Sequence, residues 1–369
     1  MACIVDILPE EILLEIFGYM DIKDLCSCAQ VCMKFRKVSS DEKVWPKKLN
    51  LNGKLVPSKF LGQAMSHGLK YLCFCCAKLS GILNLPKDNR VKYLNLYGDC
   101  CSNGDCCSNE GFVGNPEDLT DLISYFYSLE KLCLGKLSLY HPAFMNAISQ
   151  NSKSLKVLDL TKCQDLSVQS IGKIVTSCYE LTEVSFMDTD LCQEAISLIC
   201  NNLTPSILKL NLIGLKVTSE NLQILVKRCK KLIELELKDT EIGNVGVTAI
   251  IDNLSHSLVK VSLPDEVEIG KVLEFGRSMP KLRYLWYRDQ PGLDNNGLEV
   301  HERLKIQFPH LIINEGWNQI AHPGAGPNQF WEVKCKESDQ FPVRPDLTQY
   351  KKEMDEWFDE IWANLRSHS

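Results

Sequence analysis

The sequence predicts an α/β protein in which a small helical module precedes a solenoid of repeated strand and helix units, followed by an aromatic-rich C-terminal cap. Three observations predict this class. Apolar residues recur at helical spacing within the first fifty positions. A leucine pattern then repeats with a period near 26 residues. Four of the six tryptophans lie in the last 54 residues, from Gly316 to Ser369.

The helical module is assigned to residues 4–51. Leu8, Pro9 and Glu10 start a helix in which apolar residues recur at steps of three and four, a pattern typical of one apolar helical face. A break near Asp21 and two further short helical turns follow, ending near Trp45. Because a unit this short buries only part of its apolar surface, some large side chains should stay exposed. An exposed apolar patch usually marks a binding surface for a partner.

The order of these residues resembles the F-box. The resemblance is carried by Leu8-Pro9, Ile16-Phe17, Asp21, Asp24-Leu25, Val31-Cys32 and Trp45. Phe35 stands where many members of the family have tryptophan, and its similar volume makes the exchange tolerable. The resemblance implies docking to a Skp-type adaptor and, through it, to a cullin-RING scaffold. The implied adaptor-binding residues are Leu8, Pro9, Ile12, Leu13, Ile16, Phe17, Leu25, Val31, Cys32 and Trp45. The alternative is a helical cap on the repeats that follow.

The repeats have the form L-x-x-L-x-L and begin at Leu129, Leu155, Leu181, Ile207, Leu232, Leu258 and Leu282. Their starts are 26, 26, 26, 25, 26 and 24 residues apart. This is the leucine-rich-repeat pattern, with one short strand and one helix in each turn of a solenoid. Helical segments are expected at 168–176, 193–200, 221–226 and 245–251. Weaker repeats at Leu69 and Val91 and a terminal strand at 311–313 extend the predicted solenoid to residues 57–315.

A cysteine-rich loop is inserted into one repeat at residues 100–111. The start at Val91 and the start at Leu129 are 38 residues apart, twelve more than one repeat needs. Cys100, Cys101, Cys106 and Cys107 offer four thiols, enough for tetrahedral zinc. Adjacent cysteines are poorly placed to bind one ion, however, so a loop built from a duplicated CCSN unit is the favoured interpretation, and no bound metal or cofactor is predicted.

Alternate residues of each predicted strand should face outward on the concave side of the solenoid. In the last repeat these are Tyr284, Trp286 and Arg288, the residue types that dominate binding hot spots. Together with Glu183, Glu234 and Glu236 they form the predicted substrate-binding set. The alternative for the last repeat is that the C-terminal extension covers it.

The C-terminal extension, residues 316–369, is too aromatic to resemble a disordered segment. Asp346 provides a helix cap, and an amphipathic helix is expected at about 346–366. This helix either caps the open end of the solenoid, as repeat proteins require, or docks a partner; capping is favoured.

Composition excludes several classes of protein. The net charge of −6 and pI near 5.7 argue against nucleic-acid binding through phosphate neutralisation. No apolar stretch is long enough to span a membrane, and no secretory signal is recognisable, so the cytoplasm or the nucleus is expected. The 18 cysteines then fit buried thiols rather than disulfides. No catalytic motif is present, so a non-catalytic role is predicted.

The complete layout resembles the F-box/leucine-rich-repeat family from Ile4 to Glu315. It implies a substrate-recognition subunit of a Skp-cullin-F-box ubiquitin ligase, in which the repeats hold an unknown protein for ubiquitination and proteasomal degradation. Two alternatives remain. One is a scaffold that binds a Skp-type adaptor outside ubiquitination. The other is a metal-binding protein that uses the cysteine-rich loop.

Overall fold

A computed structural model describes residues 8–20, 22–45, 48–51, 55–74, 77–81, 84–96, 121–140, 145, 148–287 and 304–313. The chain divides into two compact units, Met1–Pro327 and Asn328–Ser369. All described residues belong to the first unit. The cysteine-rich loop, Arg288 and the C-terminal extension with its expected helix lie outside the described residues.

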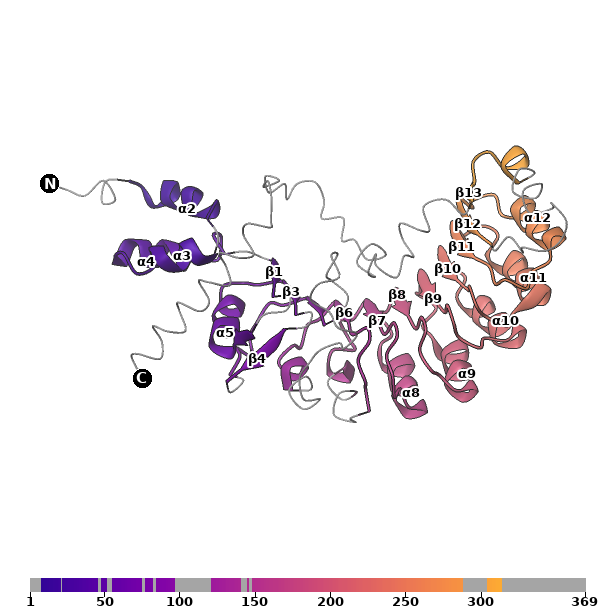
Figure 1. Ribbon diagram of the computed structural model, residues 1–369, viewed down its shortest axis with the longest axis horizontal. Helices are drawn as coiled ribbons and strands as arrows, with labels where there is room; N and C mark the ends of the chain where they lie inside the picture. The colour runs from indigo at the N-terminus through magenta and orange to yellow at the C-terminus, as the bar shows by residue number, and fades with distance from the viewer. Residues whose placement is uncertain are drawn as a thin grey trace. The chain divides into compact units, whose positions relative to one another are not determined.

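Three short helices form the N-terminal module: α2 (Glu10–Gly18), α3 (Ile22–Cys28) and α4 (Met33–Ser39) (Figure 1). Pro9 precedes α2, where its fixed φ and missing N–H cost the helix nothing. Glu10 and Glu11 occupy the first turn of α2, next to the positive end of the helix dipole. At α4 the cap is Cys32, whose Sγ accepts a hydrogen bond from the Phe35 N–H. The predicted three-helix module is confirmed.

The repeats assemble one parallel sheet, which has eleven strands among the described residues. Neighbouring strands pair in sequence order (Figure 1). They are β1 (Lys48–Asn50), β3 (Tyr71–Cys73), β5 (Tyr93–Asn95), β6 (Lys131–Cys133), β7 (Val157–Asp159), β8 (Glu183–Ser185), β9 (Lys209–Asn211), β10 (Glu234–Glu236), β11 (Lys260–Ser262), β12 (Tyr284–Trp286) and β13 (Ile312–Ile313). The repeat prediction is therefore confirmed strand by strand from Leu69 onward.

The sheet begins earlier than the sequence pattern indicates. Strand β1 pairs with β3 in parallel, with Leu49 opposite Leu72. It lies inside the range 4–51 that the sequence assigned to the helical module. A second sheet of two strands, β2 (Leu55–Pro57) and β4 (Lys78–Ser80), with helix α5 (Ser58–Ser66), follows it. The sheet of the repeats thus begins within the range assigned to the helical module, at β1.

Helices cover one face of the sheet. They are α8 (Val168–Ser177), α9 (Gln193–Asn202), α10 (Ser219–Arg228), α11 (Gly243–Leu254) and α12 (Ile269–Ser278) (Figure 1). Between helices and strands lies the core. It is formed by the middle residue of the three-residue strands from β6 to β12, a leucine or a valine, and by inward helix residues such as Ile171 and Ile174, all at most 1% exposed. The other side of the sheet is called the open face below.

A left-handed backbone residue follows the strand in consecutive repeats. Lys136, Lys162, Asp188 and Asp239 have φ between 52° and 65°, and Gly214 takes the same place with φ 75°. A Cβ at Gly214 would stand 2.4 Å from Asp188 Oδ1. The other repeats carry Lys or Asp at this place, so what distinguishes Gly214 is the close approach: a side chain there would require the Asp188 carboxylate to move.

Candidate functional site

The N-terminal module exposes large apolar side chains. Their exposed fractions run from 43% for Ile12 and Ile16, through 64% for Tyr19 and 66% for Val31, to 76% for Met33. Ile12 and Ile16 lie four residues apart on α2, and Tyr19, the C-cap residue of that helix with αR backbone angles, follows three residues later, so the three share one face. An exposed apolar row on a small module is the kind of surface that docks a partner.

Four of the predicted adaptor-binding residues are interior residues instead. Leu13, Phe17, Leu25 and Trp45 are at most 8% exposed and belong to the hydrophobic core. The Trp45 indole N–H donates to the Ser39 carbonyl at 2.6 Å, which uses its only polar atom inside the chain. Their burial argues against the direct contact with an adaptor that the sequence predicts for these four. The apolar spacing of α2 includes both core residues and exposed residues. Spacing alone therefore does not tell which apolar side chains are buried.

The remaining predicted residues lie nearer the surface. Pro9, Ile12, Ile16, Val31 and Cys32 are exposed, and Leu8 is partly buried. Two exposed residues of the module, Tyr19 and Met33, are absent from the predicted set. Tyr19 could have been found from its position three residues after Ile16 on the same helical face.

The module is held in shape by contacts between its helices. Lys37 on α4 forms an ion pair with Glu10 on α2 at 2.7 Å, and Glu10 raises the pKa of Lys37. Lys34 donates to the Leu8 carbonyl at 2.8 Å. The Phe17 and Phe35 rings meet edge to face with centroids 5.0 Å apart, a favoured aromatic geometry. Phe35 therefore packs against the core of the module.

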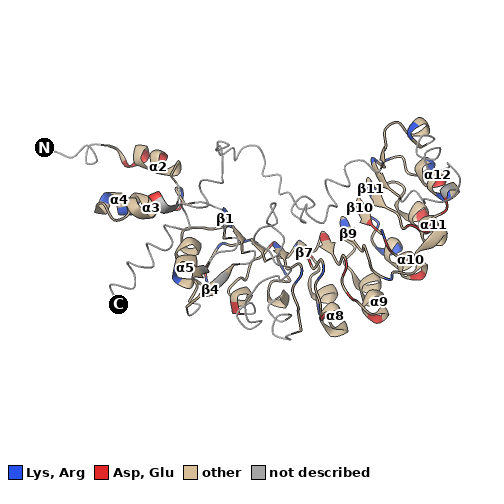
Figure 2. Ribbon diagram, viewed as in Figure 1, with Lys and Arg blue, Asp and Glu red and all other residues tan. Residues whose placement is uncertain are grey.

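Charged residues of both signs lie along the strands of the sheet (Figure 2), and ion pairs join several of them across neighbouring strands. Lys209 Nζ lies 3.7 Å from Glu183 Oε1 and 3.4 Å from Glu234 Oε1. Burial raises the pKa of Glu183, and the Lys209 charge opposes this shift. Two of the three glutamates in the predicted substrate-binding set, Glu183 and Glu234, therefore lie beside one lysine, at half-buried positions where a ligand can still reach them.

Glu236, the third glutamate of the predicted set, is fully buried. Its neighbour is Lys260, whose Nζ lies 3.2 Å from Glu236 Oε1. The third strand position is buried in every strand from β6 to β11, where the exposed fraction of its residue is at most 7%. The expected contact of Glu236 with a substrate is accordingly corrected to an interior ion pair.

The last full strand presents aromatic residues to solvent. Tyr284 is 40% exposed, and its neighbour across the sheet, Ile312, is equally exposed. Trp286 is half-buried, with the Lys238 ammonium 4.8 Å from its ring centroid. This cation–π contact fixes the indole on the open face. Arg288, the third member of the predicted trio, lies outside the described residues.

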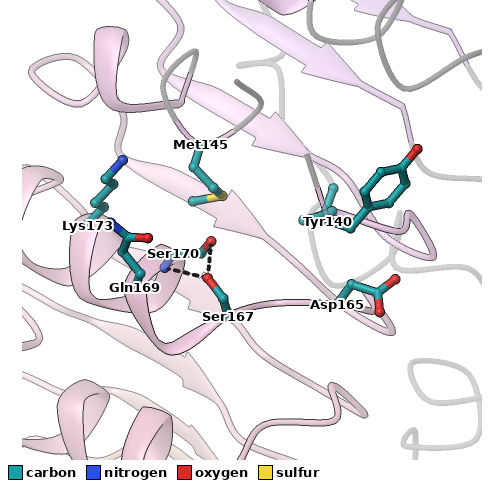
Figure 3. A pocket seen from close by; sticks show the side chains of 8 residues that line it. Tyr140, Met145, Asp165, Ser167, Gln169, Ser170 and Lys173 are labelled. Carbon is teal, nitrogen blue, oxygen red and sulfur yellow. Dashed lines mark hydrogen bonds between the residues drawn. The ribbon is translucent and has the colours of Figure 1, made fainter. Parts of the chain in front are cut away.

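A small cavity of about 60 Å³ lies beside the start of α8. Figure 3 shows Ser167 and Ser170 at its wall, joined by hydrogen bonds. The Ser167 hydroxyl accepts from the Ser170 N–H at 3.1 Å and thereby caps the helix. The two serines therefore belong to the N-terminal cap of α8. A cavity of this size holds only a few water molecules.

The described residues contain no group of three metal-ligating side chains. The buried cysteines of the repeats behave as core residues, since burial raises the pKa of Cys178 and of Cys200 to about 12. Cys100, Cys101, Cys106 and Cys107 lie outside the described part of the chain. Within that part, no helix is long and apolar enough to cross a lipid bilayer.

A three-helix module with an exposed apolar row, followed by a parallel repeat sheet, defines the class of F-box proteins with leucine-rich repeats. The family model described as the SKP2 LRR domain matches residues 111–338, more than half of the chain, and the F-box-like model matches residues 5–49. The chain belongs to the F-box/leucine-rich-repeat family with repeats of the SKP2 type.

A curated relative supports the N-terminal assignment. An F-box protein of Saccharomyces cerevisiae is 42% identical over 41 residues, which cover 11% of this chain and 6% of that protein. The chain therefore matches only a small part of that relative's length. The match covers 41 residues and says nothing of the rest of that relative.

Proposed function

We propose that this chain is the substrate-recognition subunit of a Skp-cullin-F-box ubiquitin ligase. The observation that carries the proposal is the exposed apolar row Ile12, Ile16 and Tyr19 on a module whose interior is already filled by Leu13, Phe17 and Leu25. An exposed row above a completed core has no further use in folding this module. It suits the burial of another protein's surface, which in this family is that of a Skp-type adaptor.

Docking to the adaptor would use the exposed residues of the module. Ile12, Ile16 and Tyr19 would form one apolar ridge, with Pro9, Val31 and Met33 adding contact area. Leu13, Phe17, Leu25 and Trp45 would hold the ridge in place from beneath. Cys32 contributes through its cap on α4, and Leu8 through its carbonyl, which accepts from Lys34.

The repeats would hold the protein substrate on the open face of the sheet. Tyr284 and Trp286 offer aromatic contact area, Glu183 and Glu234 offer hydrogen-bond acceptors, and Arg288 extends the same row in the sequence. The chain itself would catalyse nothing. It would accelerate ubiquitin transfer by keeping the substrate near the ubiquitin-conjugating enzyme that the cullin-RING scaffold carries, which raises the effective concentration of the reacting groups.

Protein turnover in cells distinguishes this function from that of a scaffold. Proteins captured by the repeats should have longer half-lives in cells whose only copy of the chain carries Ile12→Asp with Ile16→Asp. The matched control is Ile224→Asp, which alters a comparably exposed isoleucine on α10. Equal half-lives in both variants would show that the captured proteins are not degradation substrates.

A further inference from the structure

Charge is distributed unevenly along the sheet. The strands β1, β3, β5, β6 and β7, each taken with the described residue before it, carry Lys48, Lys70, Lys92, Lys131 and Lys156 against only Glu130 and Asp159. In the strands β8 to β12 the same positions carry Lys209, Lys260 and Arg283 against Glu183, Glu234 and Glu236. The first half of the sheet therefore has an excess of three positive charges, whereas the second half is balanced.

The basic residues of the first half stand in rows that the backbone fixes. The Lys92 N–H donates to the Lys70 carbonyl, the Glu130 N–H to the Lys92 carbonyl and the Lys156 N–H to the Glu130 carbonyl, at 2.8 to 2.9 Å. These four residues thus form one row at the edge where the strands begin. Adjacent positions in the row are about 4.8 Å apart, the distance between neighbouring strands.

One carboxylate in this row serves two lysines. Glu130 forms ion pairs with Lys92 and with Lys156 Nζ, the latter at 3.4 Å. Its pKa is lowered, chiefly by the hydrogen bond from Lys92. Lys70, Lys92 and Lys156 are all exposed. Three exposed ammonium groups stand in this row against one carboxylate, which pairs with two of them, so the edge carries net positive charge.

Two stacked aromatic rings adjoin the row on the next strand positions. Tyr71 and Tyr93 are paired in register, and their rings stack with centroids 4.3 Å apart and planes 7° apart. Lys131 is the next residue in that register, opposite Tyr93. Burial lowers the pKa of Lys131, so its charge is partly desolvated and interacts more strongly with an opposite charge than a fully hydrated one.

We propose that the basic strip, defined as Lys70, Tyr71, Lys92, Tyr93, Lys131 and Lys156, is a docking surface for a segment of a partner protein rich in aspartate and glutamate. Side-chain carboxylates would pair with the row of lysines, and the stacked tyrosines would cover the apolar part of the segment. The acidic net charge of the whole chain disfavours nucleic acid as the occupant. This strip is separate from Tyr284 and Trp286, and its binding is independent of adaptor docking.

The test is binding of the purified full-length chain to a synthetic peptide of alternating glutamate and leucine, about 16 residues long, followed by fluorescence anisotropy. Exposed ion pairs each contribute a few-fold in affinity. Combining Lys70→Gln, Lys92→Gln and Lys156→Gln should therefore weaken binding about tenfold, and raising the salt concentration should weaken binding to the unaltered chain. The matched control combines Lys231→Gln with Lys281→Gln, two exposed lysines outside the strip, and should bind as the unaltered chain does.

Three outcomes would overturn the proposal. One is equal weakening by the control and the strip variant. Another is equal binding of a peptide with glutamine in place of glutamate, which would show that charge is not recognised. The third is tighter binding of a single-stranded oligonucleotide of matched charge that the strip variant loses. Because all three altered lysines are exposed, the strip variant should unfold at the same temperature as the unaltered chain, and this is measured in parallel.

Discussion

The ammonium of Lys260 lies 3.2 Å from Oε1 of Glu236, and both side chains are buried on the open face of the sheet. Desolvation raises the pKa of Glu236, and the nearby Lys260 charge opposes that shift. The two residues belong to neighbouring strands, β11 and β10. This pair therefore links adjacent repeats, and each charge depends on the other for its stability in the interior.

Replacement of the lysine should destabilise the repeats strongly. Lys260→Met leaves Glu236 buried without its counter-charge, and removal of one partner of a buried ion pair costs about 3 to 5 kcal/mol. The free energy of unfolding, measured in urea, should fall by that amount. Lys281→Met, at an exposed position, should change it by less than about 0.5 kcal/mol. Equal stability of the two variants would contradict the importance of the buried pair.

The half-buried carboxylate of Glu183 should also make the stability depend on pH. Burial raises the pKa of Glu183 in the folded chain above its ordinary value, so the folded state holds this proton more tightly than the unfolded state. Its contribution to stability is therefore present at low pH and is lost as the pH rises from the ordinary carboxyl range through the raised pKa. Glu183→Gln should remove this part of the decline in a pH series of thermal unfolding. An identical pH profile for the variant would contradict the assignment.

The sequence predicts the repeat strands because each needs inward leucines at fixed spacing. It does not reveal β1, since Pro46 stands where the repeat pattern has its first leucine and only Leu49 and Leu51 remain. Nor does alternation distinguish Glu234 from Glu236. Both point to the open face, yet neighbouring strands bury the second, and such screening depends on contacts between residues about 25 positions apart. In the helical module, Phe17 and Ile16 are equally apolar, and only packing shows which is interior.

An asparagine between two repeats gives a third prediction. Asn151 is 1% exposed, and its Oδ1 accepts a hydrogen bond from the Leu129 N–H at 3.2 Å, in the preceding repeat. Asn151→Ala leaves that buried N–H without its acceptor, which costs about 1 to 3 kcal/mol. Urea unfolding should show this loss. Asn201→Ala, whose exposed amide bonds only within its own helix, serves as the control, and a similar effect of both changes would argue against the link between repeats.

The core of the helical module provides a fourth prediction. Phe17 is buried and packs edge to face on Phe35. Phe17→Ala should cost about 3 to 5 kcal/mol, typical of a large cavity in a core, and a module this small has little stability to lose. Amide hydrogen exchange should therefore accelerate throughout α2, α3 and α4 while the strands β7 to β11 remain protected. Unchanged exchange in the three helices would show that the ring is not essential to the module.

The most direct test of the proposed function is capture of a purified Skp-type adaptor by the chain carrying Ile12→Asp and Ile16→Asp. Both side chains are exposed, so the three helices should keep their hydrogen-exchange protection, and burial of two new charges should weaken capture by more than about tenfold. Ile224→Asp should capture the adaptor as the unaltered chain does. Undiminished capture by the folded Ile12→Asp and Ile16→Asp variant would contradict adaptor docking through this face of α2, the claim on which the proposed function depends.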